Sequence, residues 1–232
     1  KKKNLLILRL STKINPIPQK FKMDKKINFE FTRPFGPMIA KVDIPIEIID
    51  KLNAYVDEII TDKDKIQKLN YGSKLAGNGQ QEFKLEKDFI QNSGWGNFLT
   101  NCANVWLQKA LNKEITKFEL ISTWIVRQFK NDYNPIHTHS GHLSGVGYLK
   151  VPKILGEYTQ KDKVENHNGI LSLIHGSKMF LSNSTFNIEP RVGDFYFFPN
   201  YLMHTVYPFS DTDEERRSIS FNANIDESIY NI

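Results

Sequence analysis

The pattern of apolar residues changes its period near Phe118, and this change limits the chain to a fold with helices ahead of a strand-rich region. Before Phe118, apolar residues recur at helical spacing in two stretches. We expect one helix from Pro45 to about Ile66 and another from about Gly96 to Leu111. After Phe118, the apolar residues tend to alternate with polar ones, which is typical of strands with one buried face.

Short strands separated by turn signals account for most of the second half of the chain. β-branched and aromatic residues dominate the strands, and Pro, Asn and Gly stand between them. Strands of this length and spacing are typical of an antiparallel sandwich or a jelly roll. We therefore predict a mostly β fold, a cupin-like jelly roll with the helices packed outside it. The expected strands are 120–129, 143–151, 169–174, 193–198 and 217–222, with two more inside 28–43 around a turn.

Composition excludes several classes of protein. With 40% hydrophobic and 25% charged residues, the chain of 232 residues is not disordered throughout. No apolar run approaches the roughly 20 residues of a membrane-spanning helix. The single cysteine, Cys102, excludes an internal disulfide and a zinc site built from several cysteines. A reducing compartment suits a lone cysteine best, so we expect a cytoplasmic protein.

The positive charge of the chain is concentrated in residues 1–27. The whole chain has 31 basic and 26 acidic residues, of which residues 1–27 hold nine and one. The remaining 22 basic and 25 acidic residues give residues 28–232 a net charge of −3. We expect a basic, flexible leader over 1–27 and a single domain over 28–232, with a strand and helices in 28–117 and the jelly-roll core in 118–232. The charge of this body does not indicate nucleic-acid binding.

All six histidines lie in the strand-rich half, between residues 137 and 204. His137 and His139 are two residues apart, and on extended chain such residues project to one face, so the pair can bind one metal ion from a strand end. A lone His-x-His is more often a polar pair on a surface turn. His204 follows an apolar stretch and, taken alone, is more often a hydrogen-bonded core residue. Together the three favour a metal site, because neutral imidazole is a common ligand of iron, zinc and copper.

An arginine-bearing strand follows the last histidine. Alternation places Arg216 and Ser218 on one face of it and Arg217 on the other, with two apolar residues. If the first face lines a cavity, Arg216 can clamp a carboxylate in bidentate fashion and Ser218 can add a hydrogen bond. Arg217 should then end near solvent or in a peripheral ion pair, and its replacement should have little effect. The simpler alternative is that the polar face is merely solvated.

The order of these pieces resembles the 2-oxoglutarate- and Fe(II)-dependent oxygenase superfamily. The segments around them resemble the jelly-roll strands of oxygenases of marine phages and bacteria. The resemblance is strongest over about 120–224 and weaker over the two helices in front. The segments that carry it are His137–His139, Leu143–Leu149, Val192–Pro199, His204–Pro208 and Arg216–Asn222.

The resemblance implies a double-stranded β-helix closed around one iron ion. It implies an oxidoreductase, a dioxygenase that uses Fe(II), 2-oxoglutarate and dioxygen. The cosubstrate would become succinate and CO2 while an unknown substrate is hydroxylated at a C–H bond. The expected partners are therefore this small-molecule cosubstrate and a substrate that the sequence does not identify.

The resemblance also assigns residues to the site. Arg216 and Ser218 would hold the distal carboxylate of 2-oxoglutarate, and Tyr148 matches a position that adds a second hydrogen bond to it. The metal ligands would be His137, His139 and His204.

One ligand departs from the usual set of two histidines and a carboxylate. His139 stands at the position of the carboxylate, and no Asp or Glu lies between Asp132 and Glu157 to replace it. Three neutral ligands leave the ion with one more unit of positive charge. His142 is a possible substitute ligand, and Asn134 could orient a ligand through a hydrogen bond.

Three histidines also admit a different class of function. A zinc hydrolase or lyase on a cupin-like fold would use such a ligand set, but it gives no role to Arg216 and Ser218. A non-catalytic jelly-roll binding protein would explain the strands and leave the histidine positions accidental. The deciding observation is whether Arg216 faces the same cavity as the histidines.

Overall fold

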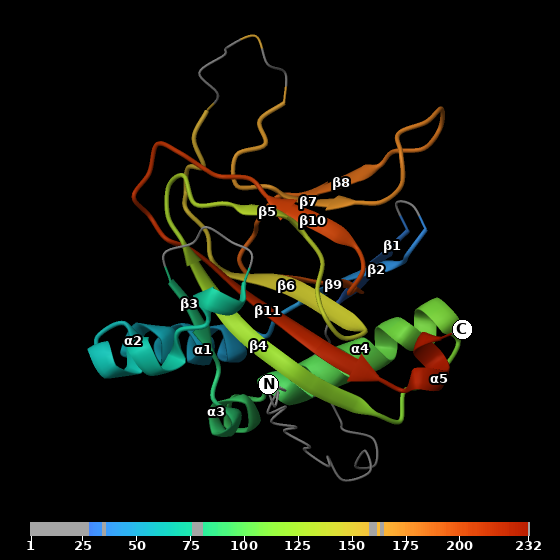
Figure 1. Cartoon of the computed structure of the whole chain (residues 1–232), viewed down its shortest axis with the longest axis horizontal. Coiled ribbons are helices and arrows are strands. Elements are labelled where there is room, and N and C mark those ends of the chain that lie inside the picture. The colour runs from blue at the N-terminus through green and yellow to red at the C-terminus, as the bar shows by residue number, and fades with distance from the viewer. Residues whose placement is uncertain (1–27, 34–35, 76–80, 158–161, 163–164, 232) are drawn as a thin grey trace, which may run out of the picture.

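The computed structural model describes residues 28–231 except 34–35, 76–80, 158–161 and 163–164, so the expected leader lies outside the described residues. Two antiparallel sheets face one another, and helices cover the outer face of the larger sheet (Figure 1). The helices are α1 (Ile46–Ile59), α2 (Lys63–Leu69), α3 (Lys87–Ser93), α4 (Trp95–Leu111) and α5 (Glu227–Tyr230), with a 3₁₀ turn η1 (Gly72–Lys74).

The sheets are built from eleven described strands. The strands are β1 (Phe29–Thr32), β2 (Ile39–Asp43), β3 (Gln81–Lys84), β4 (Phe118–Gln128), β5 (Asn134–His137), β6 (Leu143–Lys150), β7 (Leu171–Ile174), β8 (Thr185–Ile188), β9 (Asp194–Pro199), β10 (Met203–Val206) and β11 (Arg216–Ile225).

The eight strands from β4 to β11 form a jelly roll, as predicted. The larger sheet has the order β1-β2-β9-β6-β11-β4-β3, and the smaller sheet has the order β5-β10-β7-β8. The chain therefore passes repeatedly from one sheet to the other, which is the winding of a double-stranded β-helix. β1 and β2 extend one edge of the larger sheet, and β3 extends the other.

The central strands of the larger sheet bury both faces. On the outer face, Phe195 and Phe197 of β9 pack against Trp95 and Trp106 of α4, with ring centroids 5.5 and 6.0 Å apart. On the inner face, residues of β6 and β9 form a second apolar cluster with β7 of the smaller sheet. Because side chains alternate across a sheet, successive residues of β6 and β9 point in turn toward the helices and toward the smaller sheet.

Glycine in β6 allows the outer face to pack closely. A Cβ atom at Gly147 would lie 2.3 Å from Cδ2 of Phe195 and 2.9 Å from the carbonyl oxygen of Asp194. Gly145 is similarly confined by Phe195 and Phe221. The segment between Leu143 and Leu149 therefore alternates glycine toward the helices with larger side chains toward the smaller sheet.

The observed elements differ from the predicted ones mainly where the elements are short. The helix expected from Pro45 to Ile66 is interrupted after Ile59, and Asp62 begins α2 by accepting hydrogen bonds from the amides of Asp64 and Lys65. α3 and the four-residue strands β3, β5, β8 and β10 were not predicted, because four to seven residues give little periodicity. No helix among the described residues has the length and apolar character needed to cross a membrane.

The surroundings of Arg217 correct one expectation. Arg217 is fully buried rather than near solvent, because α1 covers that face of β11. Its Nε donates to Glu215 at 2.6 Å, its Nη2 to Asp57 of α1 at 2.7 Å, and its Nη1 to the backbone oxygen of Asn53 at 3.1 Å. The expected ion pair is present, but the guanidinium itself lies inside the protein. Burial raises the pKa of Glu215, but hydrogen bonds from Arg127 and Arg217 outweigh this effect and hold the pKa below its usual range.

Arg217→Ala should lower the free energy of unfolding by about 3 kcal/mol or more, because it removes one partner of a buried charge network. Urea denaturation followed by circular dichroism measures the change. Arg191→Ala is the matched control, since its pair with Glu189 is exposed and should be worth under about 1 kcal/mol. Equal effects of the two substitutions would contradict this account of Arg217.

Candidate metal and cosubstrate site

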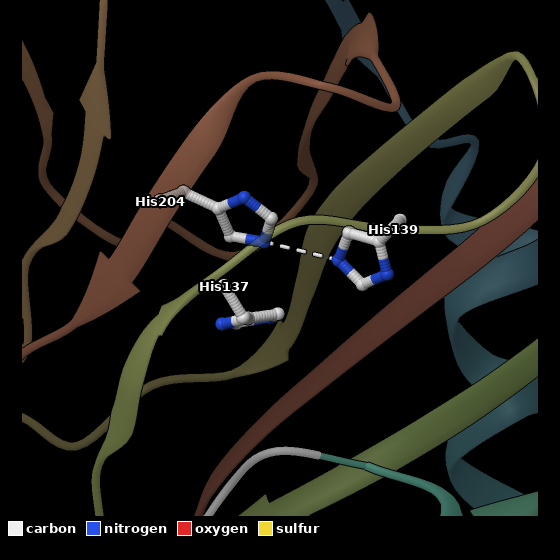
Figure 2. Close-up of side chains that lie close together, drawn as sticks. All are labelled: His137, His139 and His204. Carbon is white, nitrogen blue, oxygen red and sulfur yellow. Dashed lines mark hydrogen bonds between the residues drawn. The ribbon is translucent and has the colours of Figure 1, made fainter.

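Three histidine side chains converge between the two sheets (Figure 2). His137 ends β5 and lies directly opposite His204 of β10 in the smaller sheet. His139 follows on the loop after β5, and its ring centroid lies 4.8 Å from that of His204 and 5.1 Å from that of His137. One ring nitrogen of each residue lies within 4.8 Å of the others. The predicted convergence of the three histidines is therefore present in the fold.

Backbone carbonyls orient two of these rings. The Nδ1 atom of His137 lies 2.7 Å from the carbonyl oxygen of Pro135, and that of His204 lies 2.9 Å from the carbonyl oxygen of Leu202. A proton on each Nδ1 satisfies these contacts and leaves Nε2 as the free electron-pair donor, which is the usual arrangement around a metal-bound histidine.

The spacing of the histidine nitrogens fits a shared metal ion. The Nε2 atoms of His139 and His204 are 3.0 Å apart. Two nitrogens at about 2.1 Å from one ion and at right angles to each other are also about 3.0 Å apart. The donor set and its geometry are thus suited to a divalent transition metal.

Burial keeps two of the rings in the form that binds metal. Together with the neighbouring imidazoles, burial lowers the pKa of His139 to about 3 and that of His204 to about 4. Both rings are therefore neutral near pH 7, and a neutral ring has the free electron pair that a metal needs.

Arg216 faces the cavity that the three histidines line, as the alternation along β11 predicted. Its side chain is 1% exposed, and its guanidinium carbon lies 5.2 Å from the centre of the Tyr148 ring. Within the described part of the chain, its Nε and Nη1 and the hydroxyl of Tyr148 have no hydrogen-bond partner. Burial lowers the pKa of Arg216 and raises that of Tyr148. A buried guanidinium with two unsatisfied donors is costly, so this wall of the cavity is suited to an anion.

Register explains why the three cosubstrate candidates lie side by side on one face of the larger sheet. Ser218 of β11 lies directly opposite Tyr148 of β6, and Arg216 is two residues before Ser218 on the same face. Ser218 also lines the cavity. The sequence-predicted group of Arg216, Ser218 and Tyr148 is therefore brought together by strand pairing.

His142, the possible substitute ligand, lies outside this cluster. Its Nδ1 accepts a hydrogen bond from the amide of Ile225 at 3.1 Å, and its ring stacks on Tyr230 of α5 with centroids 3.9 Å apart. The chain turns at Gly141, which has a φ of +87°, so His142 faces the C-terminal segment instead. It cannot replace His139 without a rearrangement of that segment.

Asn134 lines the cavity but contacts a different partner from the one expected. Its Oδ1 accepts a hydrogen bond from Nε2 of Gln128 at 3.0 Å, and no contact with a histidine ring is present among the described residues. Its backbone oxygen accepts a hydrogen bond from Thr205 of β10 at 2.7 Å. Asn134 therefore positions β5 against β10 rather than an imidazole.

Sequence reasoning missed two cavity residues on β4. Trp124 lies with its ring centroid 5.6 Å from that of His139, and Gln128 lies opposite Arg216 in the β4–β11 pair. Both line the cavity. Trp124, Val126 and Gln128 alternate along the strand, and this spacing could have predicted that they share the cavity-facing side of β4.

Comparison with known structures shows the same fold at low sequence identity. A prolyl-4-hydroxylase of Pseudomonas putida matches with 14% identity and a TM-score of 0.51, over 79% of this chain and 91% of that one. AviO1 of Streptomyces viridochromogenes matches with 13% identity and a TM-score of 0.52, over 82% and 90%. HygX of Streptomyces hygroscopicus, crystallised with nickel, 2-oxoglutarate and hygromycin B, matches with 9% identity and a TM-score of 0.52, over 80% and 82%.

Comparison with curated proteins gives no match. Residues 122–222 match a family described as putative 2OG-Fe(II) oxygenases. The matched segment begins in β4, ends in β11 and contains the three histidines together with Tyr148, Arg216 and Ser218. Over this segment the chain is similar to the 2OG-Fe(II) oxygenases.

Proposed function

We propose that this oxygenase hydroxylates its substrate at an iron ion held by His137, His139 and His204, with 2-oxoglutarate anchored by Arg216. The single observation that carries the proposal is the shared cavity. A three-histidine cluster and a buried arginine without a hydrogen-bond partner at Nε and Nη1 line the same space. The histidines suit a metal ion and Arg216 suits a carboxylate. A 2-oxoglutarate molecule in this cavity could therefore contact the metal through its keto-acid end and Arg216 through its distal carboxylate.

The residues of the chain have distinct roles in this proposal. Bound iron supplies the activation of dioxygen, which is coupled to the conversion of 2-oxoglutarate to succinate and CO2. Arg216 binds the distal carboxylate, and Ser218 and Tyr148 donate hydrogen bonds to it from their hydroxyl groups. The backbone carbonyls of Pro135 and Leu202 hold two imidazoles in the orientation that directs Nε2 inward.

Charge balance favours an anionic cosubstrate at this site. Three neutral histidines leave the two positive charges of a divalent ion uncompensated, and Arg216 adds a third in the same cavity. The two carboxylates of 2-oxoglutarate contribute two negative charges. In a site with two histidines and an aspartate, the aspartate already supplies one negative charge. Binding of 2-oxoglutarate should therefore stabilise the metal in the three-histidine site more than in a site with an aspartate.

The alternatives raised by the sequence do not account for Arg216. A zinc hydrolase needs three histidines and a bound water, but it leaves the buried guanidinium without a role. A non-catalytic jelly roll leaves both the guanidinium and the converging histidines unexplained. A cytoplasmic location, which the lone cysteine favours, and a single domain over 28–232 remain part of the proposal, and the charge of that domain does not indicate a nucleic-acid partner.

His204→Ala should weaken metal binding by more than about a hundredfold, because loss of even an outer partner of a ligand costs about 10- to 100-fold. Anaerobic calorimetric titration with Fe(II), and a parallel titration with Zn(II), measure the affinity. His142→Gln is the matched control and should bind metal as the parent chain does, since His142 lies outside the cluster. A comparable loss in both variants would contradict the ligand assignment.

Arg216→Ala should weaken 2-oxoglutarate binding by about a hundredfold or more while leaving metal affinity nearly unchanged. Breaking a buried charge pair costs roughly 3 to 5 kcal/mol. Calorimetric titration of the metal-loaded, oxygen-free protein with 2-oxoglutarate measures the change. Arg216→Lys keeps the charge but not the planar two-point contact, so it should fall between the parent chain and the alanine variant. Unchanged 2-oxoglutarate affinity in Arg216→Ala would show that the cosubstrate is bound elsewhere.

A further inference from the structure

His139 is held in the histidine cluster differently from the other two rings. His137 and His204 lie in paired strands, and each directs its Nδ1 to a backbone carbonyl. His139 lies on the loop after β5, and no hydrogen bond to its Nδ1 is present among the described residues (Figure 2). Its ring packs beside Trp124 instead, with centroids 5.6 Å apart. The position of this ring therefore depends on the contacts that anchor the backbone of the loop.

The backbone of Asn200 anchors this loop. Asn200 lies in the turn between β9 and β10, where the amide of Leu202 donates to the carbonyl oxygen of Pro199 at 3.1 Å. The amide of His139 donates to the backbone oxygen of Asn200 at 3.0 Å, and the amide of Asn200 donates to the backbone oxygen of His142 at 3.1 Å. The two bonds join the turn to the loop at the histidine that lines the cavity and at the last residue of the loop.

The side chain of Asn200 adds a third bond to the loop. Its Nδ2 donates to the backbone oxygen of His139 at 3.3 Å, and its Oδ1 accepts a hydrogen bond from the hydroxyl of Tyr230 in α5 at 3.1 Å. The ring of Tyr230 also stacks on His142, with centroids 3.9 Å apart. Asn200 is thus bonded to His139 through both its backbone and its side chain, and α5 holds that side chain in place.

The end of the loop is fixed to β11. The amide of His142 donates to the carbonyl oxygen of Ala223 at 2.8 Å. The chain also passes closely over this oxygen, because a Cβ atom at Gly141 would lie 2.9 Å from it. Strands therefore fix the two ends of the loop, and the bonds to Asn200 hold His139 between them.

We propose that Asn200, held by Tyr230 of α5, is a positioning residue that places His139 where it binds metal. The proposal rests on the proposed function for the role of His139 as a ligand. Asn200 does not line the described cavity, so it acts on the metal through His139. Loss of a group that orients a metal ligand typically weakens metal binding by about 10- to 100-fold.

Asn200→Ala should weaken zinc binding by at least about tenfold, because it removes the side-chain bond to His139 and the acceptor for Tyr230. Calorimetric titration of the metal-free full chain with Zn(II) measures the affinity. Asn166→Ala is the matched control, since it removes side-chain bonds of the same kind from a loop residue that does not line the cavity. It should bind zinc as the parent chain does. Unchanged zinc affinity in folded Asn200→Ala would overturn the proposal.

A double-mutant cycle with His139 separates positioning from a general structural effect. If Asn200 acts through His139, Asn200→Ala should not lower the zinc affinity further once His139 is already alanine. Equal losses with and without His139 would overturn the proposal. Unchanged zinc affinity in His139→Ala would contradict the ligand assignment of the proposed function and this proposal with it. A loss in His139→Ala but none in Asn200→Ala would overturn this proposal alone.

Tyr230→Phe tests the contribution of α5, and it is the deciding variant if Asn200→Ala does not fold. It removes the hydroxyl that donates to Asn200 and keeps the ring that stacks on His142. The zinc affinity should fall by roughly twofold to tenfold, which is the usual effect of one hydrogen bond. Unchanged zinc affinity in Tyr230→Phe would overturn the proposed support of His139 by α5.

Discussion

The pairing of β11 between β4 and β6 determines what every other part of the site can do. It fixes the register in which Ser218 lies opposite Tyr148 and Arg216 lies opposite Gln128. A slip of one residue would direct Arg217 into the cavity and Arg216 toward α1. Such a slip would be strongly destabilising. It would take Arg217 away from the carboxylates of Glu215 and Asp57, with which it is paired, and would bury Arg216 under α1.

The winding of the jelly roll brings together residues that are far apart in the sequence. His137 and His204 are separated by 66 residues, yet they are direct partners in one ladder of the smaller sheet. His139 joins them because β5 ends at His137 and the amide of His139 donates a hydrogen bond to the carbonyl oxygen of Asn200, shortly before β10. The larger sheet contributes the opposite wall, with Arg216, Ser218 and Trp124. The cavity is thus an interface between two sheets, and neither sheet forms it alone.

The strand-rich fold and the proximity of several candidate residues could be predicted from local patterns, and the family resemblance supplied the rest of the candidate site. Spacing of two residues placed His137 and His139 on one side, and alternation distinguished Arg216 from Arg217. The burial of Arg217 could not be predicted, because it depends on α1 packing over β11 from more than 150 residues away. β5 was missed because Asn134 and Pro135 are typical of a turn. β3 was missed because four residues are too few to show a period.

The ion pair of Arg217 with Asp57 connects the buried strand β11 to a residue at the surface of the protein. The side chain of Asp57 is 48% exposed, whereas that of Arg217 is not exposed at all. Asp57 also lies 3.4 Å from Nζ of Lys150 at the end of β6. A position on α1 that looks freely replaceable therefore connects the helix layer to β6 and β11, the two strands of the proposed cosubstrate wall. If the proposed function holds, a substitution at this exposed aspartate should alter cosubstrate binding through β11, although the residue itself lies at the surface.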